Sequence, residues 1–498
     1  MKPTPVMRSR FGEPTDGNCV AVTIDGKDTF EQMYDRMLQA EKSILIANYD
    51  LDPNLRFARS YPTTLRTTLI RSACKRPLAT FIDPMSRRYS LQDLLIKKAR
   101  QGVEVKVIVW QPRIVLRLLP GADERGIDGR ADDVETLNAI SKSLDMVNRL
   151  EVRVDSTAPT LTSAHHEKII VIDGRIGFCG GLDLSRGKWD LSSHDYESSL
   201  RDPGSEPWHD VHVAVRGPVV ADLERHFRQR WIYAETKDTG QARAVRMATR
   251  GTPEGTIAAT ALRTWKEVDR NGGVRAWYAE MFRKATKGIY IENQFPFQSR
   301  SLTNLLARRL KEAPDLKVII VGPMEPNLPG FVGSMIAKMS VNDVNRNLAR
   351  LRKISEGRVA TFSLISQHKT LPNMRKQIYV HSKIMIVDDK WMTVGSANLD
   401  KNGVSDSSEF NLGITSEELA TKTRIRLWQE HTGGRLPRSR LVDFSEGFEA
   451  WRAVAKANGT RVSQDRPIMG SLYCYNFAEE GLPPPYPEAP DGNRFAIL

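Results

Sequence analysis

The chain has 498 residues, 40% of them hydrophobic and 27% charged, which is the composition of an ordinary globular protein long enough for two domains. No run approaches the roughly 18 to 20 apolar residues that a membrane-spanning helix needs, and the start of the chain lacks the apolar core of a secretory signal. The formal net charge of +13 favours a polyanionic partner such as nucleic acid, an anionic membrane surface or a phosphate-bearing substrate, unless it is only a solvated basic surface.

The first half of the chain predicts helices that alternate with strands. Apolar residues at helical spacing lead into apolar strands twice, and a short β-branched strand and one further strand follow. In chain order these elements are 30–40, 43–49, 91–101, 103–110, 169–172 and 210–215.

The second half repeats this order, at 277–285, 288–294, 302–311, 316–321, 384–387 and 409–414. The duplication predicts an α/β fold of two homologous βαβ-rich halves, each with a mixed, largely parallel sheet flanked by helices, related by a pseudo-twofold axis. We place an N-terminal domain at 1–240, a linker at 241–256 and a C-terminal domain at 257–498. A tail from about 435, rich in proline near its end, is expected to pack as an irregular surface strap.

The pattern H-x-K-x₄-D occurs once in each half. The first copy is His166, Lys168 and Asp173, and the second is His381, Lys383 and Asp388. Small residues follow both copies at the same offset, as Gly180-Gly181-Leu182-Asp183 and Gly395-Ser396-Ala397-Asn398, and these would let the backbone approach an oxyanion closely. One such motif is weak evidence, but two with matching downstream residues indicate a single site built from both halves of a monomer.

Two histidines and two lysines suit the cleavage of a phosphodiester. One imidazole attacks phosphorus and forms a phosphohistidine, while the other protonates the leaving oxygen and later deprotonates water or an alcohol. Lys168 and Lys383 would neutralise the phosphoryl oxygens, with Asn398 and Ser396 as further donors. This chemistry requires no metal or other cofactor, and four cysteines without C-x-x-C spacing argue against a zinc site or a disulfide framework.

Carboxylates are expected to fix the tautomer of each histidine. Asp210 and Glu409 lead equivalent strands, and we assign Asp210 to His166 and Glu409 to His381. The two motif aspartates, Asp173 and Asp388, lie at the far ends of their strands, roughly 15 to 17 Å from the histidines at about 3.3 Å per residue. They are therefore expected to be structural.

Longer runs around these residues carry a family resemblance. They are S-A-H-H-E-K (163–168), G-G-L-D-L-S-R-G-K-W-D (180–190), P-W-H-D-V-H-V (207–213), I-Y-I-E-N-Q (289–294) and L-W-Q-E-H (427–431). The chain resembles the phospholipase D superfamily over most of 20–435, and true phospholipases D of the eukaryotic and bacterial type in particular. The resemblance implies hydrolysis of phosphatidylcholine-like lipids to phosphatidic acid, transphosphatidylation when an alcohol replaces water, and His166 as the nucleophile with His381 as general acid and base.

One residue departs from the superfamily pattern. Asp183 stands where the second half has Asn398, and an ionised carboxylate cannot donate a hydrogen bond to phosphate. Asp183 is therefore expected to be structural, although the eukaryotic-type members share it. Three other functions remain open: a cardiolipin-synthase-type phosphatidyltransferase, a nuclease or phosphodiesterase with the same motif pair, and a catalytically silent lipid-binding protein.

The resemblance also implies a phospholipid membrane surface as partner, contacted peripherally, and no nucleic acid. Without a secretory signal or a membrane anchor the chain is expected in the cytoplasm as synthesised, and export as a secreted effector is compatible with this. An apolar, glycine-hinged segment at 329–339 is either a lid over the acyl chains or a core helix, and a basic insertion at 59–90 has no assigned role.

Overall fold

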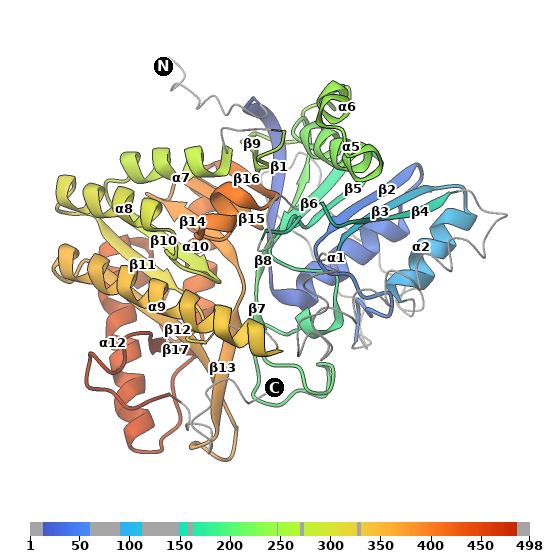
Figure 1. Ribbon diagram of the computed structural model, residues 1–498. Helices are drawn as coiled ribbons and strands as arrows, with labels where there is room; N and C mark the ends of the chain where they lie inside the picture. The colour runs from blue at the N-terminus through green and yellow to red at the C-terminus, as the bar shows by residue number, and fades with distance from the viewer. Residues whose placement is uncertain are drawn as a thin grey trace.

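Figure 1 shows the computed structural model, which describes residues 13–59, 90–111, 149–157, 163–246, 248–268, 273–325 and 330–485, without the side chains of 330–339. Two helix-flanked sheets, one from each half of the chain, lie against one another. The predicted α/β architecture with two homologous halves is confirmed, and each repeated helix and strand forms within a few residues of its predicted position. No helix in the described ranges is long and apolar enough to cross a bilayer.

The first sheet holds seven of the described strands. Their spatial order is β4 (Leu150–Asp155), β3 (Glu104–Trp110), β2 (Ser43–Asn48), β5 (Ile169–Ile172), β6 (Ile176–Gly180), β8 (Val211–Arg216) and β1 (Thr15–Ile24). The strands β4, β3 and β2 are parallel neighbours joined by crossovers, whereas the remaining neighbours pair antiparallel. Only β5 and β8 run against the other five, so the sheet is mixed and largely parallel in strand direction.

The second sheet repeats this topology strand for strand. Its order is β12 (Val359–Gln367), β11 (Lys317–Val321), β10 (Gly288–Asn293), β14 (Lys383–Val387), β15 (Trp391–Gly395), β16 (Glu409–Thr415) and β9 (Ile257–Thr264). The two sheets join at their last strands, where Thr15 of β1 pairs with Ala259 of β9. The motif strands β5 and β14 therefore occupy the same central position in the two sheets.

Helices cover the outer face of each sheet. In the first half these are α1 (Asp25–Leu38) and α2 (Leu91–Arg100), and in the second α7 (Gly273–Lys284), α8 (Arg300–Glu312) and α9 (Gly330–Ser355). The inner faces pack on α5 (Val220–Thr236) and α10 (Glu417–His431), and on one another. Side chains of β5 alternate between the two faces, with Ile169 in the inner core and Ile170 in the outer one, so the strand is buried on both sides.

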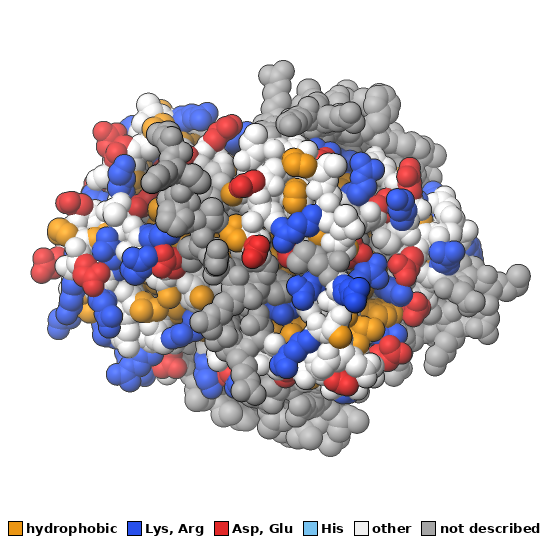
Figure 2. Space-filling view, turned by 90° about the horizontal axis from the view of Figure 1, so that it is seen from above, with side chains coloured by type: hydrophobic (Ala, Val, Ile, Leu, Met, Phe, Trp, Pro, Cys, Tyr) orange, Lys and Arg blue, Asp and Glu red, His pale blue; other side chains and the backbone are white. Residues whose placement is uncertain are grey.

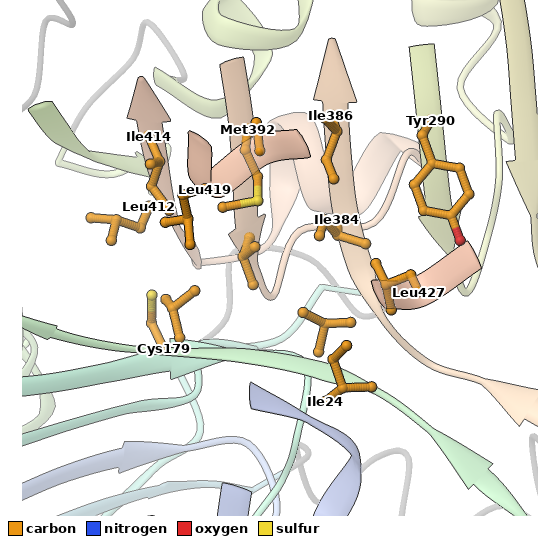
Figure 3. Close-up of a cluster of buried hydrophobic side chains, with 14 of the residues drawn as sticks. Ile24, Cys179, Tyr290, Ile384, Ile386, Met392, Leu412, Ile414, Leu419 and Leu427 are labelled. Carbon is orange, nitrogen blue, oxygen red and sulfur yellow. The ribbon is translucent and has the colours of Figure 1, made fainter. Parts of the chain in front are cut away.

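The inner core fixes how the halves sit together. Figure 3 shows Ile24 and Cys179 of the first sheet facing Ile384, Met392 and other side chains of the second. All of these side chains are buried, and they form one continuous hydrophobic cluster. An apolar interface of this kind holds two domains rigidly, so residues at the seam can form a precise site.

The C-terminal tail is not the irregular strap that was expected. Residues after 435 form α11 (Ser439–Val442), the long helix α12 (Phe444–Ser463) and β17 (Leu472–Cys474), which extends the second sheet beside β12. Phe448 and Trp451 of α12 are fully buried in the inner core. Their spacing continues the helical pattern that begins at Phe444, so the sequence does predict this helix. The prolines near the end of the tail were wrongly taken to exclude regular structure from all of it.

The linker region contains the short helix α6 (Thr239–Ala244) before β9 begins. Residues 330–339 form the start of α9, but the side chains on which the lid hypothesis depends lie outside the described residues, as does most of 59–90. Cys19 is disulfide-bonded, which the cysteine spacing did not reveal, whereas Cys179 and Cys474 are buried free thiols.

Candidate active site

The backbone of each motif histidine is hydrogen-bonded to the opposite half of the chain. The strand β13 (Arg375–Val380) ends parallel to β7 (Trp208–His209), and the amide of His381 donates to the carbonyl of His209 at 2.8 Å. The amide of His166 likewise donates to the carbonyl of Ser408 at 2.8 Å. The residue after each accepting carbonyl is a carboxylate, so each histidine lies beside an acid of the opposite half.

The histidine–carboxylate pairs are consequently crossed. Nδ1 of His166 lies 3.0 Å from Oε2 of Glu409, and Nδ1 of His381 lies 2.8 Å from Oδ2 of Asp210. The expectation that Asp210 serves His166 and Glu409 serves His381 was wrong. Both acids were identified, but the pairing depends on how the halves dock across the pseudo-twofold axis, which the repeat alignment does not contain.

Burial favours the neutral form of both imidazoles. Loss of water holds the pKa of His166 and of His381 well below the usual value, and the nearby charges of Lys168 and Lys383 lower both further. Burial also raises the pKa of Asp210 to about 7. Because Nδ1 of each ring faces a carboxylate, the tautomer that donates there leaves Nε2 with a free lone pair.

The motif lysines lie with the histidines but have different neighbours. The Nζ atom of Lys168 donates to the His166 carbonyl at 2.9 Å and lies 3.1 Å from a carboxylate oxygen of Asp183. The Nζ atom of Lys383 donates to the His381 carbonyl at 2.5 Å and to the amide oxygen of Gln294 at 3.1 Å. The charge of Lys168 is thus compensated by an acid, whereas that of Lys383 meets a neutral amide.

The pKa of the Lys383 ammonium group is strongly lowered. Its burial lowers the pKa to about 7, and the positive charge of Lys168 adds to this effect while Asp210 opposes it. An anionic ligand would restore the missing compensation. The environment of Lys383 therefore favours the binding of a phosphate group.

The small residues after each motif have a different role from the one expected. A Cβ atom on Gly181 would lie 2.0 Å from Oδ1 of Asp210, so glycine makes room for that carboxylate rather than for an oxyanion. The equivalent Ser396 is fully buried and donates its hydroxyl proton to Glu409 at 2.5 Å. Its only proton is therefore committed to the carboxylate, which corrects the expectation that Ser396 binds phosphate.

Asn398 remains available to a ligand. Among the described residues, its Nδ2 atom makes only a long contact of 3.4 Å with Gln294, and its buried Oδ1 atom has no hydrogen-bond partner. Asp183, its counterpart, ion-pairs with Lys168 and accepts from the amide of Asp50 at 3.2 Å. Asp183 thus holds a lysine in place, which agrees with its expected structural role.

The motif aspartates lie away from the histidines and fix the starts of neighbouring strands. Asp173 accepts hydrogen bonds from the amides of Lys42 and Ser43, and Asp388 accepts from those of Lys287 and Gly288, at 2.7 to 2.9 Å. Each carboxylate therefore binds backbone amides that β2 and β10 leave free. Both geometries fit the structural role predicted for these residues.

Aromatic side chains that sequence reasoning missed surround the histidines. Tyr49 lies edge-on to His166 with 4.8 Å between ring centroids and stacks on Trp110 at 4.9 Å, and Trp208 lies 4.9 Å from His381. Tyr49 follows β2 as Gln294 follows β10, so the repeat alignment could have found both positions. The site consequently has an apolar, aromatic wall on each side of its polar centre.

Residues that could share a cation lie elsewhere. Among the described residues, histidine and carboxylate atoms come close enough in two overlapping groups, Asp25, His194, His209 and Glu430, and His209, Glu292 and His431. Neither group contains a motif histidine.

Two family models match successive parts of this chain. A family model described as phospholipase D matches residues 79–287, and one described as cardiolipin synthase, PLD-like domain, matches 278–429. Phospholipase D alpha 4 of Arabidopsis thaliana is 26% identical over 83% of this chain and 65% of the relative. Phospholipase D1 of Saccharomyces cerevisiae is 23% identical over 87% of this chain and 30% of the relative, so the chain spans only part of these proteins.

The fold also has a solved counterpart. The crystal structure of phosphatidylserine synthase from Haemophilus influenzae matches with a TM-score of 0.54 at 11% identity, over 90% of this chain and 94% of the other. The likeness extends through both halves and supports the same duplicated architecture. With two H-x-K-x₄-D motifs meeting at one seam and both halves matched by family models, the chain belongs to the phospholipase D superfamily.

Proposed function

We propose that the protein is a phospholipase D, a phosphodiesterase that hydrolyses phosphatidylcholine-type glycerophospholipids to phosphatidic acid and a free head group. The observation that carries this proposal is the meeting of two imidazoles, each with Nδ1 at a carboxylate, and two lysines at one seam. The relatives named phospholipase D support the same reaction class. A lipid surface is then the partner, met peripherally by a monomer.

In the proposed reaction, Nε2 of His166 attacks phosphorus while the bond to the head-group oxygen breaks. The negative charge of the bound phosphate would raise the pKa of His381, so that its protonated ring gives the Nε2 proton to the departing oxygen, and a phosphatidyl group remains on His166. Water then attacks phosphorus in this intermediate while His381 takes a proton from the water, and phosphatidic acid leaves. An alcohol in place of water gives transphosphatidylation by the same step.

The remaining side chains would stabilise charge and orientation. Lys168, Lys383 and Asn398 would contact the phosphoryl oxygens as negative charge builds up on them. Glu409 and Asp210 would hold the imidazoles and stabilise each imidazolium as it forms. Sequence symmetry does not distinguish the two histidines, so the choice of His166 as nucleophile rests on the family resemblance.

A second candidate function has its own support. The model that matches 278–429 is described as cardiolipin synthase, and such a phosphatidyltransferase would use the same two histidines with a lipid alcohol as acceptor. The motif pair also suits a nuclease. Both alternatives share the first half of the mechanism and differ in substrate and acceptor.

Product analysis distinguishes these functions. We expect vesicles of phosphatidylcholine to release choline and phosphatidic acid, and to form phosphatidylethanol when ethanol is added, both measured by mass spectrometry. Phosphatidylglycerol vesicles test for cardiolipin, and plasmid DNA tests for nicking. Cardiolipin or nicked DNA without choline release would replace the proposed activity by the corresponding alternative.

The pH dependence should report Lys383. Because its pKa is about 7 in the free protein, the lysine is charged below that pH and loses its charge as the pH rises through it. We expect kcat/KM on a soluble short-chain lipid to fall about tenfold for each pH unit above this value, since the free enzyme titrates in this parameter. Lys383→Arg keeps its charge and should shift this fall to higher pH, and an unchanged alkaline limb would assign the fall to another group.

A further inference from the structure

A second cluster of titratable side chains lies directly behind the active site. Asp25, at the start of α1, His194, His209 and Glu430 converge there, and Glu430 comes from the other half of the chain. Their side chains are at most 10% exposed. The amide of Asp25 donates to the carbonyl of Asp210 at 2.8 Å, so the cluster adjoins the strand that serves His381.

Each imidazole of this cluster has its outer nitrogen bound to a separate carboxylate. Nδ1 of His194 lies 3.0 Å from Oδ2 of Asp190, and Nε2 of His209 lies 2.9 Å from Oε2 of Glu292. With a cation bound, each imidazole would be neutral and these contacts would use its one N–H group. The inner nitrogens, Nε2 of His194 and Nδ1 of His209, would then direct lone pairs into the same space, as metal-binding histidines oriented by carboxylates do.

Among the described residues, one of the inner contacts is a hydrogen bond. Nδ1 of His209 is hydrogen-bonded to Oδ1 of Asp25 at 2.9 Å and lies 3.3 Å from Oε1 of Glu430. Nε2 of His194 lies 3.6 and 3.7 Å from the same two oxygens, too far for hydrogen bonds. Nε2 of His194 and Oε1 of Glu430 are buried and have no hydrogen-bond partner in the described part of the chain. A centre of positive charge among these four atoms would satisfy all of them.

The separations match a tetrahedral cation. Bonds of about 2.0 to 2.2 Å from Zn²⁺ to nitrogen and oxygen place neighbouring ligand atoms about 3.3 to 3.6 Å apart. Four ligand atoms have six separations. Of the four between nitrogen and oxygen, three lie within or near this range, and the fourth, between His209 and Asp25, is of hydrogen-bond length. The nitrogen–nitrogen and oxygen–oxygen separations are within 4.8 Å. Asp25 and His194 also have positive φ angles of 65° and 44°, an unusual backbone that recurs at functional sites.

The cluster gathers more negative charge than its permanent cations balance. The carboxylates are the buried Asp25, Asp190 and Glu292 and the 10% exposed Glu430, and their described contacts include one permanent cation, Arg201, which lies 3.1 Å from Asp190. Either protonated imidazoles or a bound cation would balance the remaining charge. The neighbouring group around Glu292 is different because its carboxylate already accepts from His209, His431, Tyr290 and Ser382. The atoms that lack hydrogen-bond donors thus belong to the group of Asp25, His194, His209 and Glu430.

We propose that Asp25, His194, His209 and Glu430 form a structural site for a divalent cation of the Zn²⁺ type that clamps the two halves behind His381. Two imidazoles and two carboxylates are a ligand set that suits Zn²⁺. The cation takes no part in the attack on phosphorus. Its role is to fix β7 against α10, and with it Asp210 and His381.

Metal analysis of the full chain tests this site without any lipid assay. With a purification tag that contains no histidines, we expect about one equivalent of zinc per folded chain by elemental mass spectrometry, as a closed four-ligand site implies. Replacement of zinc by Co²⁺ should give visible absorption bands between about 500 and 650 nm, the signature of tetrahedral cobalt that this geometry requires. His194→Gln and Glu430→Gln should each lose the metal.

His431→Gln is the matched control, because this buried histidine belongs to the adjacent group and should leave the metal content unchanged. If the ligand variants do not fold, Co²⁺ titration of the wild-type protein still decides the question. Folded wild-type protein that neither carries nor binds stoichiometric metal would overturn the proposal, and imidazolium ions would then balance the carboxylates. Metal retained in both ligand variants would also overturn it. Neither result bears on choline release, so failure of this site and failure of the proposed activity are separable.

Discussion

His166→Ala is expected to abolish choline release from phosphatidylcholine vesicles, and His381→Ala is expected to do the same, each by at least about 10⁴-fold. The physical reason is that, in the proposed mechanism, neither imidazole can replace the other: one forms the bond to phosphorus, and the other moves the proton. Single replacements should therefore cost as much as the double replacement. His368→Ala, which changes a histidine outside both clusters, is the matched control and should retain full activity.

A substrate with a good leaving group separates the two roles. With a p-nitrophenyl ester the departing oxygen needs no proton, so His381→Ala should still release one equivalent of p-nitrophenol and accumulate phosphorylated His166, visible by intact mass at neutral pH. His166→Ala should release none. The opposite pattern would assign the nucleophile to His381, and turnover of lipid by either variant would refute the paired mechanism.

The crossed carboxylate pairs predict which step each acid supports. Asp210→Asn removes the partner of His381, so it should slow choline release from lipid by about 10² to 10⁴-fold, as loss of an orienting carboxylate does in serine proteases, and affect the p-nitrophenyl burst much less. Glu409→Gln removes the partner of His166 and should slow both substrates alike. Stopped-flow rates on the two substrates measure this difference.

Pairing within each half would reverse the two results. Ser396→Ala tests the same geometry more gently, because it removes only the proton that Glu409 accepts and should resemble a weak form of Glu409→Gln. Asp388→Asn is a suitable control, since this carboxylate binds backbone amides of β10 and lies at the opposite end of the motif strand from His381. It should reduce the free energy of unfolding while the burst remains.

The fold could be predicted from the sequence because its evidence is local and repeated. Alternating helices and β-branched strands appear twice in the same order, and each copy supports the interpretation of the other. The strands β1 and β9, which join the halves, were missed because neither lies in the part of the repeat that carries the motifs. The helix α12 was missed although Phe444, Phe448 and Trp451 mark its buried face.

The site could be predicted in its residues but not in its contacts. The histidines, lysines and both orienting acids were identified by type and position. Which acid meets which histidine depends on the docking of two sheets through the inner core, and no local pattern encodes that. The same reason hides the cluster at Asp25, whose four members are far apart in the sequence and meet only across the seam.

The crossed pairs have a consequence for a chain that is still being synthesised. His166 has no orienting acid until Glu409 has been made and its strand has docked, and Asp210 likewise waits for His381. A half that folds alone has a complete motif but a catalytically incompetent histidine. Completion of the fold would thus switch on the proposed activity, and an unfinished chain would lack it.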